Sequence, residues 1–275
     1  MSRQDEWVRG YVLHLRPFRE TSTIAELFTE KYGRISAVYR GVKGRSSKTA
    51  KMRVLQPFQP LLFTWQGDRE LKTGRKFEAD GAGHYYTGSH LYSALYINEL
   101  LLRMLIKEDA HIELFGEYER LLVALKQLNS SDSDIPKPSE NNSLESGILE
   151  RRSLENKPLE IILRNFEAYL LSQLGFELIF DKDSEYHDVS EASIYRYDVE
   201  QGFVLVALPG SVRLDPKIKS QCFTGSQLLA IYNQQWHREG TLAAAKRLMR
   251  LALAPHLGDR PLESRQLFLN SSTAK

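Results

Sequence analysis

Residues 7–80 contain short apolar segments that are rich in β-branched and aromatic residues. Turn-forming or polar residues separate them, among them Pro17, Gly33 and Gly67-Asp68. This spacing predicts short β-strands rather than helices. We expect five strands, at Trp7–Leu15, Thr21–Phe28, Arg34–Arg40, Leu61–Gln66 and Leu71–Phe77. Five short strands in a row favour a five-stranded barrel of the OB type over a sandwich.

Beyond residue 88 the apolar spacing becomes helical. Ser89–Ile106 is apolar on nearly every side, which predicts a helix buried on most faces. Leu114–Leu128 carries apolar residues at steps of one, three and four, as an amphipathic helix does. A third helix is expected from near Pro158 to Gly175, and a last one over Thr241–Ala254, ended by Pro255.

Two stretches interrupt this helical part. Asn129–Lys157 is polar, with two prolines and several serines, and is predicted to be a flexible surface loop. Residues 180–222 are irregular, with short strands expected at Ile194–Tyr197 and Phe203–Ala207. We therefore predict an α+β protein with two domains: an OB-fold barrel at 1–82 and a mostly helical domain at 83–275.

Charge is distributed unevenly along the chain. The net charge is only +2, but residues 1–80 contain 16 Lys and Arg against 9 Asp and Glu. Residues 81–275 contain 21 against 26. This asymmetry indicates that the barrel meets a polyanion and that the remainder has another task.

The segment Arg40–Arg53, RGVKGRSSKTAKMR, contains six basic residues and no acidic one. Basic side chains that neutralise phosphates release condensed counterions, so such a segment favours nucleic-acid binding; a solvated charged hairpin is the alternative. The predicted DNA contacts are Arg34, Arg40, Lys43, Arg45, Lys48, Lys51 and Arg53, followed by Arg69, Lys72 and Arg75.

Aromatic residues of the predicted barrel are interleaved with the cations Arg9, Arg16, Arg34, Arg40, Arg69 and Lys72. Exposed rings beside cations suit sequence-independent binding of single strands, because bases stack while the charges follow the phosphates. The competing interpretation is that the rings fill the barrel, and we expect at least half of them in the core. The rings concerned are Tyr11, Phe28, Tyr39, Phe58, Phe63 and Trp65.

Signals for catalysis are weak. The chain has neither a GxxxxGK[ST] loop nor a G-x-S-x-G elbow, and its one cysteine, Cys222, is expected to be a small buried residue. The acidic run with Asp181, Asp183, Glu185 and His187 fits either a solvated loop or a divalent-ion site for phosphodiester cleavage. We expect no cofactor and no catalytic activity.

The chain starts with a polar segment, MSRQDEW, that lacks the apolar region of a secretory signal. Its apolar runs are also too short to span a bilayer. The sequence therefore predicts a cytoplasmic protein.

Several segments together resemble one protein family. Val12–Gly44 and Leu55–Trp65 resemble the N-terminal part of bacterial RecO, a recombination mediator, and Leu91–Leu105 resembles the helix after its barrel. Ile162–Leu178 and Ala244–Phe268 resemble later segments of that family in the same order.

The resemblance implies an OB-fold followed by a helical region with a small zinc-ribbon-like insertion. It also implies non-enzymatic binding of single- and double-stranded DNA, annealing of complementary strands without ATP, and cooperation with RecR in loading RecA onto DNA coated by single-strand binding protein. Many members hold zinc with four cysteines. This chain has only Cys222, so a degenerate, metal-free insertion is expected.

RecO-like proteins also dock the acidic C-terminal tail of single-strand binding protein. A guanidinium beside an apolar surface suits such a tail, and the resemblance points to Arg164 and Phe166. An arginine lying over the helix surface is the alternative. Two other functions stay open at this point: an OB-fold RNA-binding factor and a metal-dependent nuclease.

Overall fold

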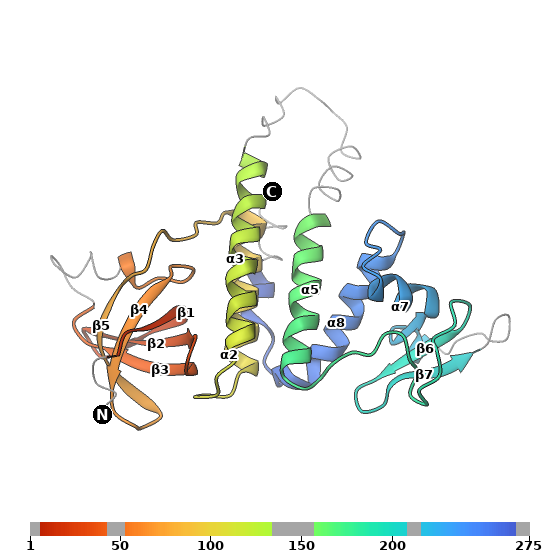
Figure 1. Ribbon diagram of the computed structural model, residues 1–275, viewed down its shortest axis with the longest axis horizontal. Helices are drawn as coiled ribbons and strands as arrows, with labels where there is room; N and C mark the ends of the chain where they lie inside the picture. The colour runs from red at the N-terminus through yellow and green to blue at the C-terminus, as the bar shows by residue number, and fades with distance from the viewer. Residues whose placement is uncertain (1–5, 43–52, 134–156, 208–215, 268–275) are drawn as a thin grey trace. The chain divides into compact units, whose positions relative to one another are not determined.

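The computed structural model describes residues 6–42, 53–133, 157–207 and 216–267. The chain divides into two compact units, which are considered separately (Figure 1). The first comprises residues 1–137 and 259–275, and the second comprises residues 138–258. The first unit thus includes helices that follow the barrel. The domain boundary at residues 82 and 83 stays a prediction, because it marks the end of the barrel and not that of a compact unit.

The first unit contains the predicted five-stranded closed barrel. Its strands lie in the order β1-β2-β3-β5-β4, and β4 pairs with β1 to close it. Only β3 and β5 run parallel; the other pairs are antiparallel. This architecture confirms the barrel and is that of an OB-fold. The strands are β1 (Val8–Phe18), β2 (Ser22–Thr29), β3 (Gly33–Tyr39), β4 (Leu61–Gln66) and β5 (Leu71–Ala79).

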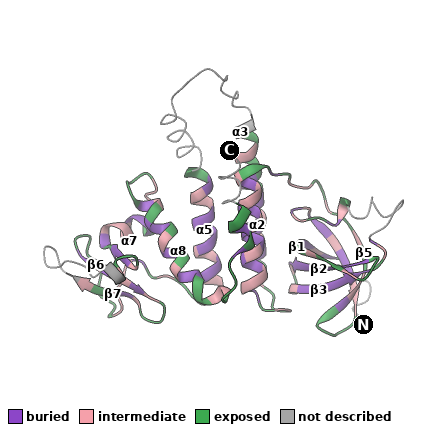
Figure 2. Cartoon of the chain, turned by 180° about the vertical axis from the view of Figure 1, so that it is seen from behind, coloured by how far each residue is buried: buried purple, intermediate pink, exposed green. Residues whose placement is uncertain are grey.

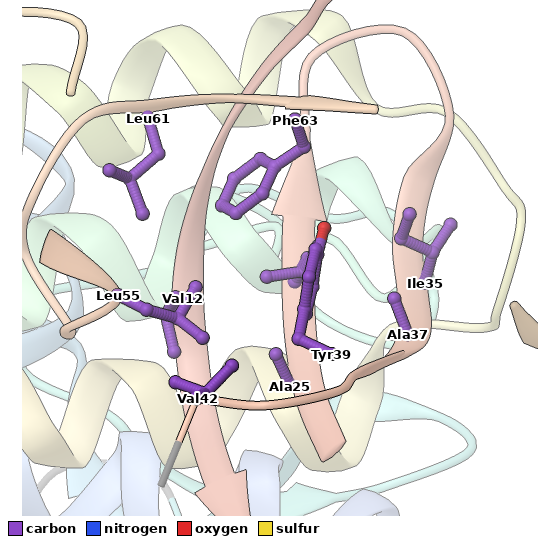
Figure 3. Packing of buried hydrophobic residues seen from close by; sticks show 10 residues of the cluster. Val12, Ala25, Ile35, Ala37, Tyr39, Val42, Leu55, Leu61 and Phe63 are labelled. Atoms are coloured by element: carbon purple, nitrogen blue, oxygen red, sulfur yellow. The ribbon is translucent and has the colours of Figure 1, made fainter. Parts of the chain in front are cut away.

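Alternate residues of the strands fill the barrel interior (Figure 3). Ala25 and Leu27 on β2 and Ile35, Ala37 and Tyr39 on β3 are all buried there. The ring of Tyr39 passes over Gly74 of β5, where a Cβ would lie 2.3 Å from Cε1 of Tyr39. Because residue 74 is a glycine, β5 leaves room for the ring of Tyr39 in the core.

Two helices, α2 (Gly88–Met104) and α3 (Ile112–Ser133), pack in the same unit as the barrel. Asn98 of α2 donates hydrogen bonds to the carbonyls of Val12 and Leu13, where the register of β1 shifts. Tyr118 of α3 donates to the side-chain oxygen of Asn98. Helix α3 extends to Ser133, so residues 129–133 of the predicted loop are helical, and its residues 134–156 lie outside the described part.

The C-terminal segment is attached to helix α2. Arg103 donates to the carbonyls of Arg260 and Pro261, and the carboxylate of Glu99 accepts from the backbone of Glu263 and from both backbone and side chain of Ser264. Burial alone would raise the pKa of Glu99, but the hydrogen bonds from Ser264 and Glu263, with the charge of Arg103, hold it below its usual value.

The second unit consists of helices and a small antiparallel sheet in the order β7-β6-β8. Helix α5 packs against α8, each through an apolar face (Figure 2). The sheet lies mostly within the predicted insertion, whose relation to a zinc ribbon stays a prediction. The elements are α5 (Lys157–Gln173), β6 (Ile194–Asp198), β7 (Gly202–Ala207), α6 (Pro216–Lys219), β8 (Cys222–Thr224), α7 (Gly225–Tyr232) and α8 (Thr241–Leu257).

Two features of this unit differ from the expectation. Helix α8 continues past Pro255 to Leu257: the proline lies in the last turn, where its missing N–H removes one intrahelical hydrogen bond. Helix α7 was not predicted. It begins at a capping box in which Thr224 and Gln227 bond each other's backbone N–H groups, a signal present in the sequence.

Candidate nucleic-acid interface

The predicted DNA contacts lie at opposite ends of the barrel. Arg40 follows the last residue of β3, whereas Arg69 lies in the turn between β4 and β5. Two contacts show that this turn lies close to the beginning of β3. Glu70 in the turn forms a salt bridge with Lys107, and the backbone of Lys107 forms a β-bridge with Arg34. The two ends differ in what surrounds them.

The end near the start of β3 is closed by the connection between α2 and α3. Glu108 donates its backbone N–H to the carbonyl of Arg34, and its carboxylate lies 2.6 Å from the buried Nζ of Lys72. Gly33 approaches the backbone of Asp109 so closely that a Cβ would lie 1.6 Å from its carbonyl oxygen. Lys72 is therefore held in an ion pair at this junction and is poorly placed to bind a phosphate in this conformation; its role as a DNA contact stays a prediction.

Arg34 is also held within the protein. Its Nε donates to the carbonyl of Leu105, and its guanidinium pairs with Glu26 at 3.3 Å. Glu26 is itself buried and accepts a hydrogen bond from Ser36. A buried carboxylate needs such partners, so Arg34 balances Glu26 and is poorly placed to bind a phosphate.

The opposite end presents exposed cations. The parallel register aligns Val38 with Thr73, so its continuation brings Arg40 beside Arg75. Arg75 donates to the side chain of Gln66. Arg40, Arg53 and Arg75 are exposed, as is Arg69 at the other end. Arg40 and Arg53 flank the basic segment, whose predicted contacts Lys43, Arg45, Lys48 and Lys51 lie outside the described residues.

Most of the rings considered for stacking are in the core. Tyr11, Phe28, Tyr39, Phe58 and Phe63 are buried, and Trp65 is half-buried, which confirms that at least half fill the interior. Tyr11 and Phe28 point out of the barrel, but α3 covers them with Phe115 and Tyr118 at centroid distances of 5.3–6.0 Å.

Tyr85 was missed. It is the most exposed large apolar residue in the described part of the chain, at 79%. It lies in GAGHYYTG, between β5 and α2, where an aromatic pair among small residues was the available signal.

The predicted tail-binding residues on α5 are buried. Phe166 belongs to the apolar face of the helix, and Arg164 forms a buried ion pair with Glu167 at 2.8 Å. Binding of a peptide by Phe166 therefore requires rearrangement. The Nε of Arg164 is buried and has no hydrogen-bond partner among the described residues.

A second arginine in this unit lines a cavity of about 520 Å³. The guanidinium of Arg247 lies 4.3 Å from the centroid of the Phe223 ring and donates to the carbonyl of Cys222. Its buried Nε has no partner among the described residues, and burial lowers its pKa. Ile194 and Phe223 add apolar surface to the same cavity. A cation in this setting suits a carboxylate with an apolar neighbour.

The acidic run has a structural arrangement. The carboxylate of Asp183 accepts the backbone N–H groups of Glu185 and His187, and Lys182 pairs with Asp188. Within the described residues, no three or more His, Cys, Asp or Glu side chains are grouped to hold a metal ion. The acidic run therefore forms a turn in which the carboxylate of Asp183 accepts hydrogen bonds from the backbone.

Cys222 is buried, as expected, and burial raises the pKa of its thiol against the opposing effect of Arg196 and Arg247. A thiol with a raised pKa is a poor nucleophile. Among the described helices, none is long and apolar enough to span a membrane.

Comparison with known proteins places the chain in a family. Residues 1–79 match the family model described as "Recombination protein O N terminal". The chain is 38% identical over 260 residues to DNA repair protein RecO of Pseudomonas aeruginosa (strain LESB58), covering 94% of this chain and 93% of that protein. It is 37% identical over 265 residues to DNA repair protein RecO of Yersinia pestis (strain Pestoides F), covering 96% and 94%. The chain is therefore a member of the RecO family.

Proposed function

We propose that this chain acts in DNA repair and homologous recombination as a mediator that binds single- and double-stranded DNA and anneals complementary strands without ATP. With RecR it would help to load RecA onto DNA coated by single-strand binding protein. Membership of the RecO family carries this proposal, since relatives similar over nearly the whole chain are named DNA repair proteins.

The exposed arginines of the barrel support a location for DNA. Arg40, Arg53 and Arg75 are exposed, and Arg40 and Arg53 border the basic segment. Cations there would neutralise two phosphate backbones at once and so reduce the repulsion between complementary strands. Binding by this mechanism depends steeply on salt and little on sequence.

Annealing of two complementary labelled oligonucleotides without nucleotide tests the proposal. The wild type is expected to accelerate annealing, and Lys43→Glu/Arg45→Glu/Lys48→Glu is expected to abolish the acceleration. Annealing that survives this triple change would place the DNA site elsewhere. A wild type that does not anneal, or that prefers RNA to DNA of equal length, would overturn the mediator proposal.

A matched pair of single changes tests which end of the barrel binds. Arg40→Glu and Arg69→Glu each reverse one exposed arginine at opposite ends. We expect Arg40→Glu to weaken DNA binding more, because Arg69 lies at the end closed by the connection between α2 and α3. Equal losses would mean that DNA follows the whole length of the barrel.

Docking of an acidic C-terminal tail is proposed for the second unit. Arg164 is the position suggested by resemblance, but its guanidinium is engaged by Glu167, whereas Arg247 lines an open cavity. Binding of a labelled peptide with acidic residues and a free C-terminal carboxylate, compared between Arg164→Ala and Arg247→Ala, distinguishes the two. We expect a larger loss for Arg247→Ala, and a larger loss for Arg164→Ala would show that α5 rearranges.

A further inference from the structure

Two neighbouring cavities lie in the first unit, and His84 lines both. The smaller, of about 260 Å³, has aromatic and apolar walls that include Tyr85, Tyr86 and Leu91. The larger, of about 550 Å³, is lined by two arginines, Arg9 and Arg120, and by Glu119. An aromatic cavity next to one with an exposed arginine matches the two parts of a nucleotide, a flat base and a charged phosphate.

The walls of the smaller cavity are fixed by the fold. His84 donates its backbone N–H to the carbonyl of Phe58, and the ring of Phe58 meets that of Tyr86 edge-on at 5.3 Å. Tyr86 is anchored by a hydrogen bond from its hydroxyl to the carbonyl of Leu122. The exposed ring of Tyr85 is thus carried on a segment that is held on both sides.

Polar groups in this region remain available for a ligand. The Nδ1 of His84 is buried and has no hydrogen-bond partner among the described residues. Burial, and then the charge of Lys126, lower the pKa of His84, so at neutral pH its imidazole is neutral and can bond a base edge. Gln56, an exposed amide in the same cavity, lies three residues after Arg53 of the basic segment.

The two arginines of the larger cavity differ in how firmly carboxylates hold them. Arg9 is held by Asp80 and Glu119, each at 2.9 Å, and serves the fold. Arg120 is 68% exposed at its side chain, and the partner it has among the described residues is Glu117, one helical turn away. Exposed pairs of this kind are weak, so Arg120 can turn to a phosphate.

We propose that the cavity beside Tyr85 binds an unpaired nucleobase of single-stranded DNA, which stacks on Tyr85 and meets His84, while Arg120 contacts its phosphate. The site accepts single strands and not duplexes, because a base must leave its partner to enter. This inference rests on the proposed DNA binding and assigns the part of the surface that distinguishes single strands from duplexes.

The test measures binding of a fluorescein-labelled oligothymidine and of a labelled duplex by the full chain, at several salt concentrations. Tyr85→Ala should weaken single-strand binding about five- to hundredfold, as loss of a stacked base does, and leave duplex binding and the salt dependence of single-strand binding unchanged. Tyr85→Phe should bind as the wild type does. Tyr186→Ala is the matched control, because that tyrosine is 77% exposed and lies in the second unit.

A second readout follows the base directly. The fluorescence of 2-aminopurine in a single strand should be quenched by stacking on the wild type and not on Tyr85→Ala. Arg120→Ala should instead reduce the salt dependence of single-strand binding.

Separate results overturn separate proposals. If the wild type binds both DNAs and Tyr85→Ala binds single strands equally well, the stacking site is refuted and the mediator proposal stands. Equal losses on single strands and duplex would also refute stacking. A wild type that binds neither DNA would refute both proposals.

Discussion

Replacing Glu108 by Gln should destabilise the barrel more than replacing Lys72 by Met, although both changes remove the same ion pair. The side chain of Lys72 is 5% exposed and that of Glu108 is 44% exposed. Without the carboxylate, the ammonium remains buried and uncompensated, which costs about 3–5 kcal/mol in known cases. The amide oxygen of Gln still accepts a hydrogen bond, so we expect about 3 kcal/mol.

Without the ammonium, the remaining carboxylate is close to water and can be hydrated. Methionine also retains most of the apolar stem of Lys72, so we expect a cost of about 1 kcal/mol or less, as for a buried ion pair replaced by an apolar residue. Glu108 has a φ of +61°, and Gln preserves the shape of the side chain at that strained position. The double change should cost about as much as Lys72→Met alone.

Urea unfolding measures these free energies if the signal reports the first unit. The three tryptophans are Trp7, Trp65 and Trp236, so in a Trp236→Phe background the fluorescence excited selectively from tryptophan comes from the barrel sequence alone. A cost for Lys72→Met equal to or above that for Glu108→Gln would refute the reasoning. If Lys72→Met left stability intact but weakened DNA binding tenfold and reduced its salt dependence, Lys72 would be a DNA contact after all.

Three further results are expected. Gly74→Ala should cost about 1–3 kcal/mol of unfolding free energy because its Cβ would overlap the ring of Tyr39. Gly116→Ala, in an open helical position, should instead stabilise the protein by up to about 1 kcal/mol. Equal effects of the two changes would contradict the close contact between Gly74 and Tyr39. Cys222 should react with a thiol reagent at pH 8 at least about tenfold more slowly in the folded than in the urea-unfolded protein, and fast reaction would contradict its burial. The pKa of Glu99 lies below 4.5 because its hydrogen bonds outweigh the effect of burial. Its carboxylate should therefore stabilise the fold above pH 4.5, and this stabilisation should be lost as the pH falls through the pKa of Glu99 in the folded protein. Glu99→Gln should flatten that part of the stability profile, and an unchanged profile would contradict the linkage.

Local sequence pattern was sufficient for the strands and most helices. The five strands of the barrel were located to within a few residues because their apolar segments are short and end at turn-forming residues. The pattern also identified the faces of α3 and α5. These features depend on neighbours in sequence, which a single chain reveals.

The environment of each cation depends on distant contacts and was not predictable in this way. In β5, Leu71 is exposed and Lys72 is buried, the reverse of their hydrophobicity. The reversal follows from Glu108, which reaches Lys72 from a connection 36 residues later. Similarly, Tyr11 and Phe28 occupy the outer face of their strands, and only the packing of α3 puts them out of reach of bases.

These long-range contacts change the proposed mechanism and not only its residue assignments. Arg34 and Lys72 are committed to carboxylate partners, and most of the barrel rings considered for stacking lie in the core. Both findings argue against a single barrel face that supplies phosphate contacts as well as stacking. Arg40 and Arg53, which are exposed, border the basic segment, whereas the exposed ring of Tyr85 follows the barrel. Phosphate neutralisation without stacking suits a duplex, and a separate stacking position suits an unpaired strand. In the proposed mechanism, a protein that anneals strands must bind its substrate and release its product. A stacking position that only an unpaired base can use would weaken binding of the duplex once the bases have paired.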